Sequence, residues 1–128
     1  MYLIITRSFP PELGGMQSLM WGLAKEMSKN FMIKVFADYQ ENHKEFDKEV
    51  NFSIERVGGI KFLRKIRKAQ LINEFLKENK VQGIIADHWK SLELIKTTKN
   101  KYCLIHGKEI NHPKGSFQNK KIVKVLNA

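Results

Sequence analysis

The chain has 128 residues, which is enough for one domain with a single modest core. A hydrophobic content of 42% and an aromatic content of 10% are ordinary for a folded protein and argue against disorder of the whole chain. The formal net charge of +10 indicates an anionic partner, such as phosphate groups, a membrane surface or nucleic acid, without choosing among them.

Cysteine usage and hydropathy bear on the compartment. The single cysteine, Cys103, lies in a short apolar run, where a buried and unreactive thiol is expected. One cysteine forms no disulfide framework, which fits a reducing compartment. No basic leader precedes the first predicted strand, and no apolar run approaches the roughly 20 residues that span a bilayer. We therefore expect a cytoplasmic protein, with a peripheral position at the inner membrane face as the alternative.

The beginning of the chain predicts a strand, a helix and a second strand. Residues 2–6 are apolar and β-branched, which is typical of a buried strand. Apolar side chains then recur at helical spacing from Met16 to Met27, and residues 32–37 predict the second strand. In a parallel sheet, this βαβ unit has a right-handed crossover.

The loop between the first strand and this helix is the most informative stretch. Pro10 and Pro11 fix φ and remove two amide donors, so we expect a stiff loop. Gly14 and Gly15 let another group approach the start of the helix, where unpaired N–H groups favour an anion such as a phosphate. A tight turn without a ligand is the alternative, because the spacing matches neither of the common phosphate-loop motifs.

Strands and helices continue to alternate along the rest of the chain. We expect a loop at 39–50, an edge strand at 52–57, a basic helix from about Ile60 to Asn79, a strand at 82–86, a short helix at 91–98, a strand at 102–105 and a helix at 118–126. This alternation predicts an α/β fold, a Rossmann-like three-layer domain with a mainly parallel sheet.

Three polar loops follow predicted strands, at residues 10–15, 87–89 and 106–109. The carboxyl ends of parallel strands share one edge of the sheet, and open α/β sheets bind ligands at that edge near the point where the strand order reverses. The convergence of these loops predicts a binding site there.

The amino-acid sequence of the first loop resembles that of a known family. Positions 9–17 read Phe-Pro-Pro-Glu-Leu-Gly-Gly-Met-Gln, and the following helix carries Leu-Ala-Lys-Glu-Met. This segment resembles the first loop of the GT-B glycosyltransferases of the family 4 type, in which a Gly-Gly loop lies against a sugar-nucleotide donor. Ile-His-Gly-Lys-Glu at 105–109 is similar to the second landmark of that family. Asp-His-Trp at 87–89 resembles the segment after its fourth strand, although Ala86 stands where a histidine is often found.

The resemblance implies transfer of a sugar from a nucleotide-diphosphate donor to a hydroxyl acceptor, which would be a lipid, a saccharide or a cell-envelope glycan precursor. It implies no separate cofactor and no essential metal, and it assigns no catalytic residue in this chain. Gly14 and Gly15 would contact the diphosphate or the sugar, and His106 would contact the donor sugar. Candidate acceptor or cleft contacts are Arg7, Gln17, His88, Lys108 and Glu109.

Several of these residues have an ordinary structural interpretation as well. His106 would cap a strand end through a backbone hydrogen bond, and Arg7 would pair with Glu12. Lys108 and Glu109 would be solvated loop charges. The spacing of the residues does not decide between the two interpretations.

The helix expected at 60–79 combines an apolar stripe with cations crowded into its first half. The apolar stripe either covers the sheet completely or leaves part of itself for an anionic bilayer, on which several lipid-glycosylating GT-B enzymes are thought to dock. The candidate membrane contacts are Lys61, Arg64, Lys65, Arg67 and Lys68.

The resemblance covers only the first domain of a two-domain enzyme. The second Rossmann-like domain would carry most donor contacts, so we expect a truncated or split glycosyltransferase that is inactive without a complementary C-terminal half. The alternative is a freestanding α/β module that binds a phosphate or a nucleotide. Nucleic-acid binding is disfavoured, because most aromatic residues fall at predicted core positions instead of positions free to stack on bases.

Overall fold

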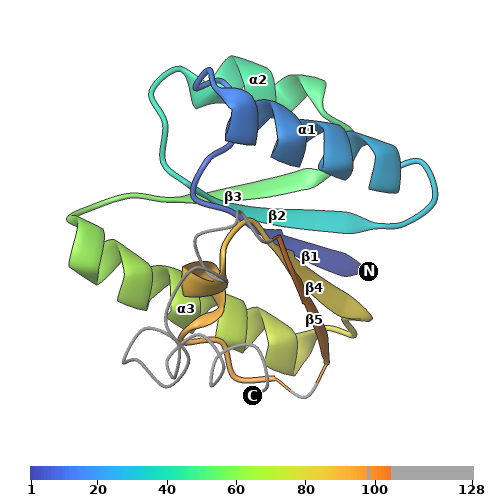
Figure 1. Ribbon diagram of the computed structural model, residues 1–128, viewed down its shortest axis with the longest axis vertical. Helices are drawn as coiled ribbons and strands as arrows, with labels where there is room; N and C mark the ends of the chain where they lie inside the picture. The colour runs from blue at the N-terminus through green and yellow to red at the C-terminus, as the bar shows by residue number, and fades with distance from the viewer. Residues whose placement is uncertain (98, 105–128) are drawn as a thin grey trace, which may run out of the picture.

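The computed structural model describes residues 1–97 and 99–104 (Figure 1). In this part of the chain, one five-stranded sheet has the order β3-β2-β1-β4-β5, and every neighbouring pair is parallel. The strands are β1 (Tyr2–Ile5), β2 (Ile33–Asp38), β3 (Ser53–Val57), β4 (Gly83–Ala86) and β5 (Asn100–Cys103). The predicted parallel α/β sheet is confirmed, with β3 at an edge as expected.

Helices cover both faces of the sheet and make three layers (Figure 1). One face carries α1 (Gly15–Met27) and α2 (His43–Glu49), and the other carries α3 (Lys61–Glu78) with the short 3-10 helix η1 (Trp89–Leu92). This arrangement is the Rossmann-like three-layer domain that the sequence predicts.

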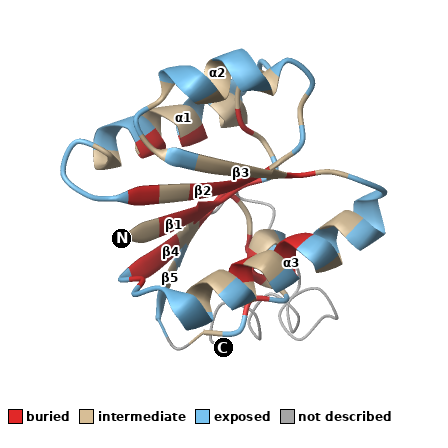
Figure 2. Ribbon diagram, turned by 180° about the vertical axis from the view of Figure 1, so that it is seen from behind, coloured by how far each residue is buried: buried red, intermediate tan, exposed pale blue. Residues whose placement is uncertain are grey.

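Side chains of β1 alternate between two hydrophobic cores, because successive strand residues point to opposite faces. Leu3 and Ile5 lie in the core beneath α3, whereas Ile4 lies in the core beneath α1. Burial is concentrated in the central strands, and exposure in the outer faces of the helices (Figure 2). The carboxyl end of β1 is therefore a rigid position from which to hold a site.

The segment 39–50 contains α2, so the prediction of a loop there is wrong. The helix has a single large apolar residue, Phe46, and no periodic pattern arises from one residue. Its stabilisation is tertiary instead. Phe46 makes edge contacts with Trp21 and Phe9, at ring-centroid distances of 5.1 Å and 6.1 Å, and Asp47 pairs with Arg56 at 2.8 Å.

Two later elements differ from their predicted bounds. In place of the helix expected at 91–98 there is η1, which begins at the buried Trp89, where the His88 ring accepts a hydrogen bond from the Lys90 amide at 3.2 Å. β5 starts at Asn100 and leaves Cys103 half-buried instead of buried. The helix expected at 118–126 lies outside the described residues.

We predict that Phe46→Ala lowers the free energy of unfolding by about 2 kcal/mol, less than the 3–5 kcal/mol of a fully buried phenylalanine, because Phe46 is half-buried. Urea denaturation measures the change, and faster amide exchange in residues 43–49 should accompany it. Phe62→Ala removes the same atoms from an exposed position and is the control. Equal losses in the two variants would contradict the aromatic anchoring of α2.

Candidate functional site

The strand order reverses between β1 and β4. The chain passes from β1 to β2 and β3 on one side, and then returns through α3 to place β4 on the other side of β1. At such a point the loops after the two strands diverge and leave a crevice, where open α/β sheets bind their ligands. The loops after β1 and β4 are therefore the natural place to look for a site.

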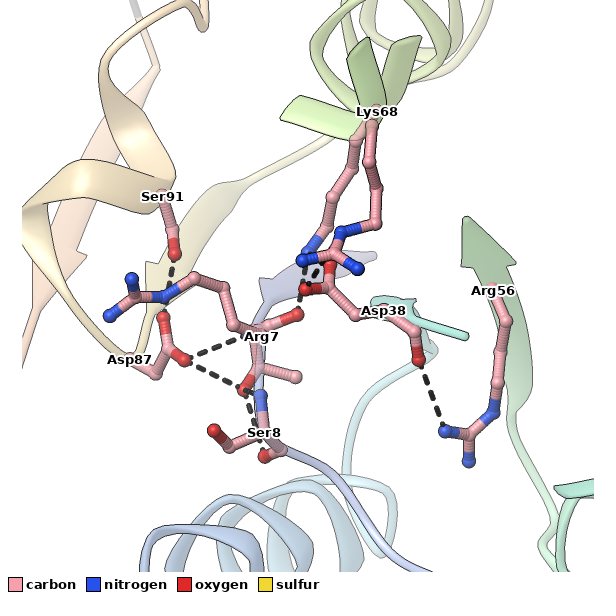
Figure 3. Close-up of polar contacts among 9 residues, drawn as sticks. Arg7, Ser8, Asp38, Arg56, Lys68, Asp87 and Ser91 are labelled. Atoms are coloured by element: carbon pink, nitrogen blue, oxygen red, sulfur yellow. Dashed lines mark hydrogen bonds and ion pairs between the residues drawn. The ribbon is translucent and has the colours of Figure 1, made fainter. Parts of the chain in front are cut away.

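A buried aspartate joins these two loops. Asp87 follows β4 and is 2% exposed. Its carboxylate accepts hydrogen bonds from the Thr6 hydroxyl at 3.0 Å, the Arg7 backbone N–H at 2.9 Å and the Ser91 hydroxyl at 2.7 Å (Figure 3). One carboxylate thus holds the end of β1, the end of β4 and η1 together, and it fixes the backbone from which the Arg7 side chain extends.

A second buried network lies at the end of β2. The ammonium of Lys68, a buried residue of α3, donates to the Thr6 carbonyl at 2.6 Å and to Asp38 Oδ1 at 2.9 Å. The other Asp38 oxygen lies 3.4 Å from Arg64 Nε (Figure 3). Burial lowers the pKa of Lys68 below 10.5, and the neighbouring Asp38 carboxylate opposes that shift.

An arginine on β3 positions the proline-glycine loop. The Arg56 guanidinium pairs with Asp47 and donates from Nη2 to the Pro10 carbonyl at 2.5 Å. From Nη1 it also reaches the Asp38 carbonyl at 3.5 Å. Because Phe9 is buried beneath α1, the loop is held on both sides before it reaches the glycines.

The start of α1 is open. Gly14 is the N-cap residue, and among residues 1–97 and 99–104 neither a side-chain cap nor an acidic residue in the first turn satisfies the N–H groups there. Outside the neighbouring residues and the helix backbone, no atom of the described residues lies within 4 Å of the position that a β-carbon on Gly15 would take, whereas the Gln17 side chain occupies that position at Gly14. A ligand therefore has access to the backbone at Gly15, beside the amide of Gln17.

A pocket of about 270 Å³ lies on the other face, between α3 and η1 and beneath the ends of β1 and β2. Its charged lining is mostly basic. The cationic residues are Arg7, Lys61, Arg64, Lys65, Lys68 and Lys90, and the acidic residues are Asp38 and Glu93.

Ion pairs account for only part of this positive charge. Asp38 is shared by Arg64 and Lys68, and Lys65 pairs with Glu93 at 3.1 Å. The other three cations of the lining are Arg7, Lys61 and Lys90. None of them has a carboxylate within 4.0 Å among residues 1–97 and 99–104. This pocket, which we call the basic pocket, suits an anionic ligand.

The sequence-predicted contacts fall into three groups. Arg7 lines the basic pocket and does not pair with Glu12, which accepts a hydrogen bond from Gln40 at 3.0 Å. His88 is outside that lining, because its ring bonds the Lys90 amide and tilts against Trp89 at 5.6 Å. The neighbouring Trp89 is buried. The last group, His106, Lys108 and Glu109, lies outside the described residues.

One of the five candidate membrane contacts on the basic helix is buried. Lys61, Lys65 and Arg67 are exposed and Arg64 is half-buried, but Lys68 is buried against Asp38 and cannot reach a membrane surface.

The apolar stripe of the helix is only partly used to cover the sheet. Ile60, Phe62 and Leu63 are 74%, 71% and 59% exposed, so the start of α3 presents apolar and basic side chains together.

Asp38, Lys90 and Glu93 are site residues that the sequence analysis did not identify. Asp38 is the last residue of an apolar strand, and Asp87 directly follows another. A polar residue at the carboxyl end of an apolar strand is the sequence signal that could have identified Asp38. The partner of Asp38 lies 30 residues away on α3, and no sequence pattern indicates that pairing. Lys90 and Glu93 sit in or beside η1, whose bounds the sequence did not predict.

A scan against protein-family models finds no match for the chain, and a search of curated proteins finds none. Within residues 1–97 and 99–104, no helix has the length and apolar character needed to cross a membrane. The same residues contain no cluster of three or more His, Cys, Asp or Glu side chains that could hold a metal ion.

We predict that Lys68→Met destabilises the fold by about 3–5 kcal/mol, because it leaves Asp38 with only one cation and the Thr6 carbonyl without its ammonium donor. Lys65→Met is the matched control on the same helix, where a half-exposed pair contributes up to about 1 kcal/mol. Chemical denaturation at neutral pH measures both. Similar losses would show that burial of the Lys68 pair carries no special weight.

The lowered pKa of Lys68 also predicts a pH dependence. Between the folded-state pKa and 10.5, the unfolded chain binds the proton more strongly, so the free energy of unfolding should rise with pH in the window just below 10.5. Lys68→Met should lack this contribution, and Lys65→Met should retain it. Denaturation curves measured through that window would refute the assignment if all three proteins had the same slope.

Proposed function

We propose that this chain is the acceptor-side half of a GT-B glycosyltransferase of the family 4 type, which transfers a sugar from a nucleotide-sugar donor to a hydroxyl acceptor. One observation carries the proposal. The motif that is similar to that family's donor loop leads into the N-terminus of α1, where Gly15 leaves the backbone accessible. This loop follows β1, and the strand order of the sheet reverses between β1 and β4. Open α/β sheets bind their ligands at this position.

The chemistry of the loop supports a diphosphate ligand. The first N–H groups of α1 have no side-chain cap, and the helix dipole favours negative charge in front of them. Because Arg56 and the buried Phe9 hold the preceding loop, these groups need little reorganisation to receive a ligand. In the proposed enzyme, Gly14 and Gly15 contact the donor diphosphate or sugar, and His106 remains the candidate for the donor sugar.

The basic pocket is the proposed acceptor side. Arg7, which follows β1, is part of its lining. The α3 side of the pocket lies on the opposite face of the sheet from α1 (Figure 1). The proposed reaction also requires a second Rossmann-like domain, supplied as a complementary C-terminal half, and we place the enzyme in the cytoplasm with access to an anionic membrane surface. Sequencing the coding DNA beyond the codon for Ala128 tests this requirement directly.

A second candidate is a freestanding module that binds a phosphate or a nucleotide. The basic pocket favours it, because three cations of the lining have no carboxylate partner within the described residues and no second domain is needed to build the pocket. In this case the ligand would contact the pocket and leave the Gly-Gly loop unoccupied.

We predict that Gly15→Ala weakens binding of UDP-glucose to the chain about tenfold, because the added methyl group occupies the open space in front of the helix start. Two-dimensional amide NMR during titration with UDP-glucose measures the affinity. The amides of residues 15–17 should shift in the wild type and respond more weakly in the variant.

Gly22→Ala is the matched control, since its β-carbon also meets no atom within 4 Å and it lies on the same helix away from the N-terminus. Neither variant should lower stability, because alanine is preferred over glycine within a helix by about 1 kcal/mol. Unchanged affinity in Gly15→Ala, or an equal loss in Gly22→Ala, would contradict the donor-loop assignment.

A further inference from the structure

We infer that the basic pocket binds a phosphate group, so that the acceptor of the proposed transferase is a phosphorylated molecule. The role of the ligand as an acceptor rests on the proposed function, whereas the phosphate site is inferred from the residues of the pocket alone. The pocket lies between α3 and η1, and within the described part of the chain its lining contains six cationic and two acidic side chains.

The charge balance of the pocket is the first argument. Asp38 is already neutralised by Lys68 and Arg64, and Glu93 by Lys65, so neither carboxylate presents an uncompensated charge to a ligand. The lining keeps an excess of positive charge that no described carboxylate answers. Cations confined around one small hollow repel one another, and a bound anion relieves that repulsion.

The three cations that have no carboxylate partner among the described residues come from different elements around the pocket, and one of them, Lys90, also lies over the Trp89 ring at 5.7 Å. Arg7 comes from the end of β1, Lys61 from the first turn of α3 and Lys90 from η1. In Figure 3 the Arg7 side chain extends toward Ser91, which also lines the pocket. The backbone of Arg7 is fixed by Asp87, so its guanidinium leaves from a rigid base and offers the planar pair of donors that suits a phosphate.

The size of the pocket limits the ligand. A volume of about 270 Å³ is at the lower end of small-molecule sites and accommodates a phosphate ester with a small alcohol or sugar. Apart from the charged residues and Ser91, the lining is apolar and includes Ile5, Ala69, Ile72, Leu94 and Ile95. A pocket of this size, with cationic and apolar lining residues, is suited to a compact phosphorylated molecule.

The phosphate could belong to a soluble ester or to a lipid headgroup, which present the same chemistry to the pocket. Lys61, a lining residue at the start of α3, is flanked in the sequence by the exposed residues Ile60, Phe62 and Leu63. Apolar side chains beside a cationic pocket would enter the interface of a bilayer while the pocket holds a headgroup. The experiment therefore needs one arm for each source.

The first arm titrates the full chain with glycerol 3-phosphate and, separately, with glycerol, and amide NMR reports the affinity. Glycerol 3-phosphate should bind, and glycerol should not. Arg7→Gln and Lys61→Gln should each weaken binding about tenfold, as expected for the loss of one charge-assisted hydrogen bond. Lys77→Gln removes the same charge from an exposed α3 residue outside the pocket and should leave the affinity unchanged.

The second arm measures cosedimentation with vesicles of phosphatidylcholine alone and of equimolar phosphatidylcholine and phosphatidic acid. Binding only to the anionic vesicles that is lost in Arg7→Gln and retained in Lys77→Gln supports a lipid phosphate, and Phe62→Ser should then weaken it as well. Binding of glycerol 3-phosphate without vesicle binding supports a soluble ester. Equal losses in Arg7→Gln and Lys77→Gln in both arms, or no binding in either arm, would overturn the phosphate site.

This outcome is separable from that of the donor loop. The pocket variants report on Arg7 and Lys61, and the Gly15→Ala variant reports on the start of α1 on the other face of the sheet. Phosphate binding together with a UDP-glucose affinity that Gly15→Ala leaves unchanged would reject the donor loop and keep the pocket. A UDP-glucose affinity weakened by Gly15→Ala, without phosphate binding, would keep the transferase and reject a phosphorylated acceptor.

Discussion

The carboxylate of Asp87 holds the two strands between which the sheet order reverses. A buried carboxylate is costly unless donors surround it, and here hydroxyl and amide groups from both loops do so. The bonds from Arg7 and Ser91 to this carboxylate fix the start of the loop after β1 and the position of η1, and the Thr6 hydroxyl also accepts a hydrogen bond from the Ser8 backbone N–H. Together with the backbone hydrogen bond from the Asp87 N–H to the Ile5 carbonyl at 3.2 Å, this side chain sets the geometry of the crevice.

Asp38 has a comparable role at the end of β2, but it sets charge as well as position. It takes up two cations of α3 and brings Lys68 into contact with the Thr6 carbonyl, so that helix and sheet are joined beside the crevice. Lys65 of the basic pocket pairs with Glu93, and the other cations of its lining have no carboxylate partner among the described residues. A fold with fewer acidic than basic residues leaves such an excess somewhere, and this one gathers part of it in a hollow.

The strands and their parallel arrangement could be predicted from sequence, because apolar runs such as residues 2–6 and 82–86 are bounded by polar loops and turn residues. α2 could not, since Phe46 and Asp47 stabilise it only through partners on other elements. Arg7 was found as a polar residue after a strand, but the burial of Lys68 was not, because a lysine among exposed lysines looks like another solvated charge until its distant partner Asp38 is known. Local pattern thus indicates which edge of the sheet carries the site, and nonlocal pairing decides which residues line it.

The two candidate binding positions lie on opposite faces of the sheet and are joined by the short segment after β1. Thr6 donates to Asp87 and accepts from Lys68, the Arg7 side chain enters the basic pocket, and the chain then continues through the buried Phe9 to the glycines at α1. A displacement of this segment would move both positions at once. If a donor binds at the helix start and an acceptor in the pocket, their separation is set by a few rigid residues and not by the flexibility of either ligand. Such a constraint is what a transfer reaction needs, because orientation of two substrates contributes a large share of the rate.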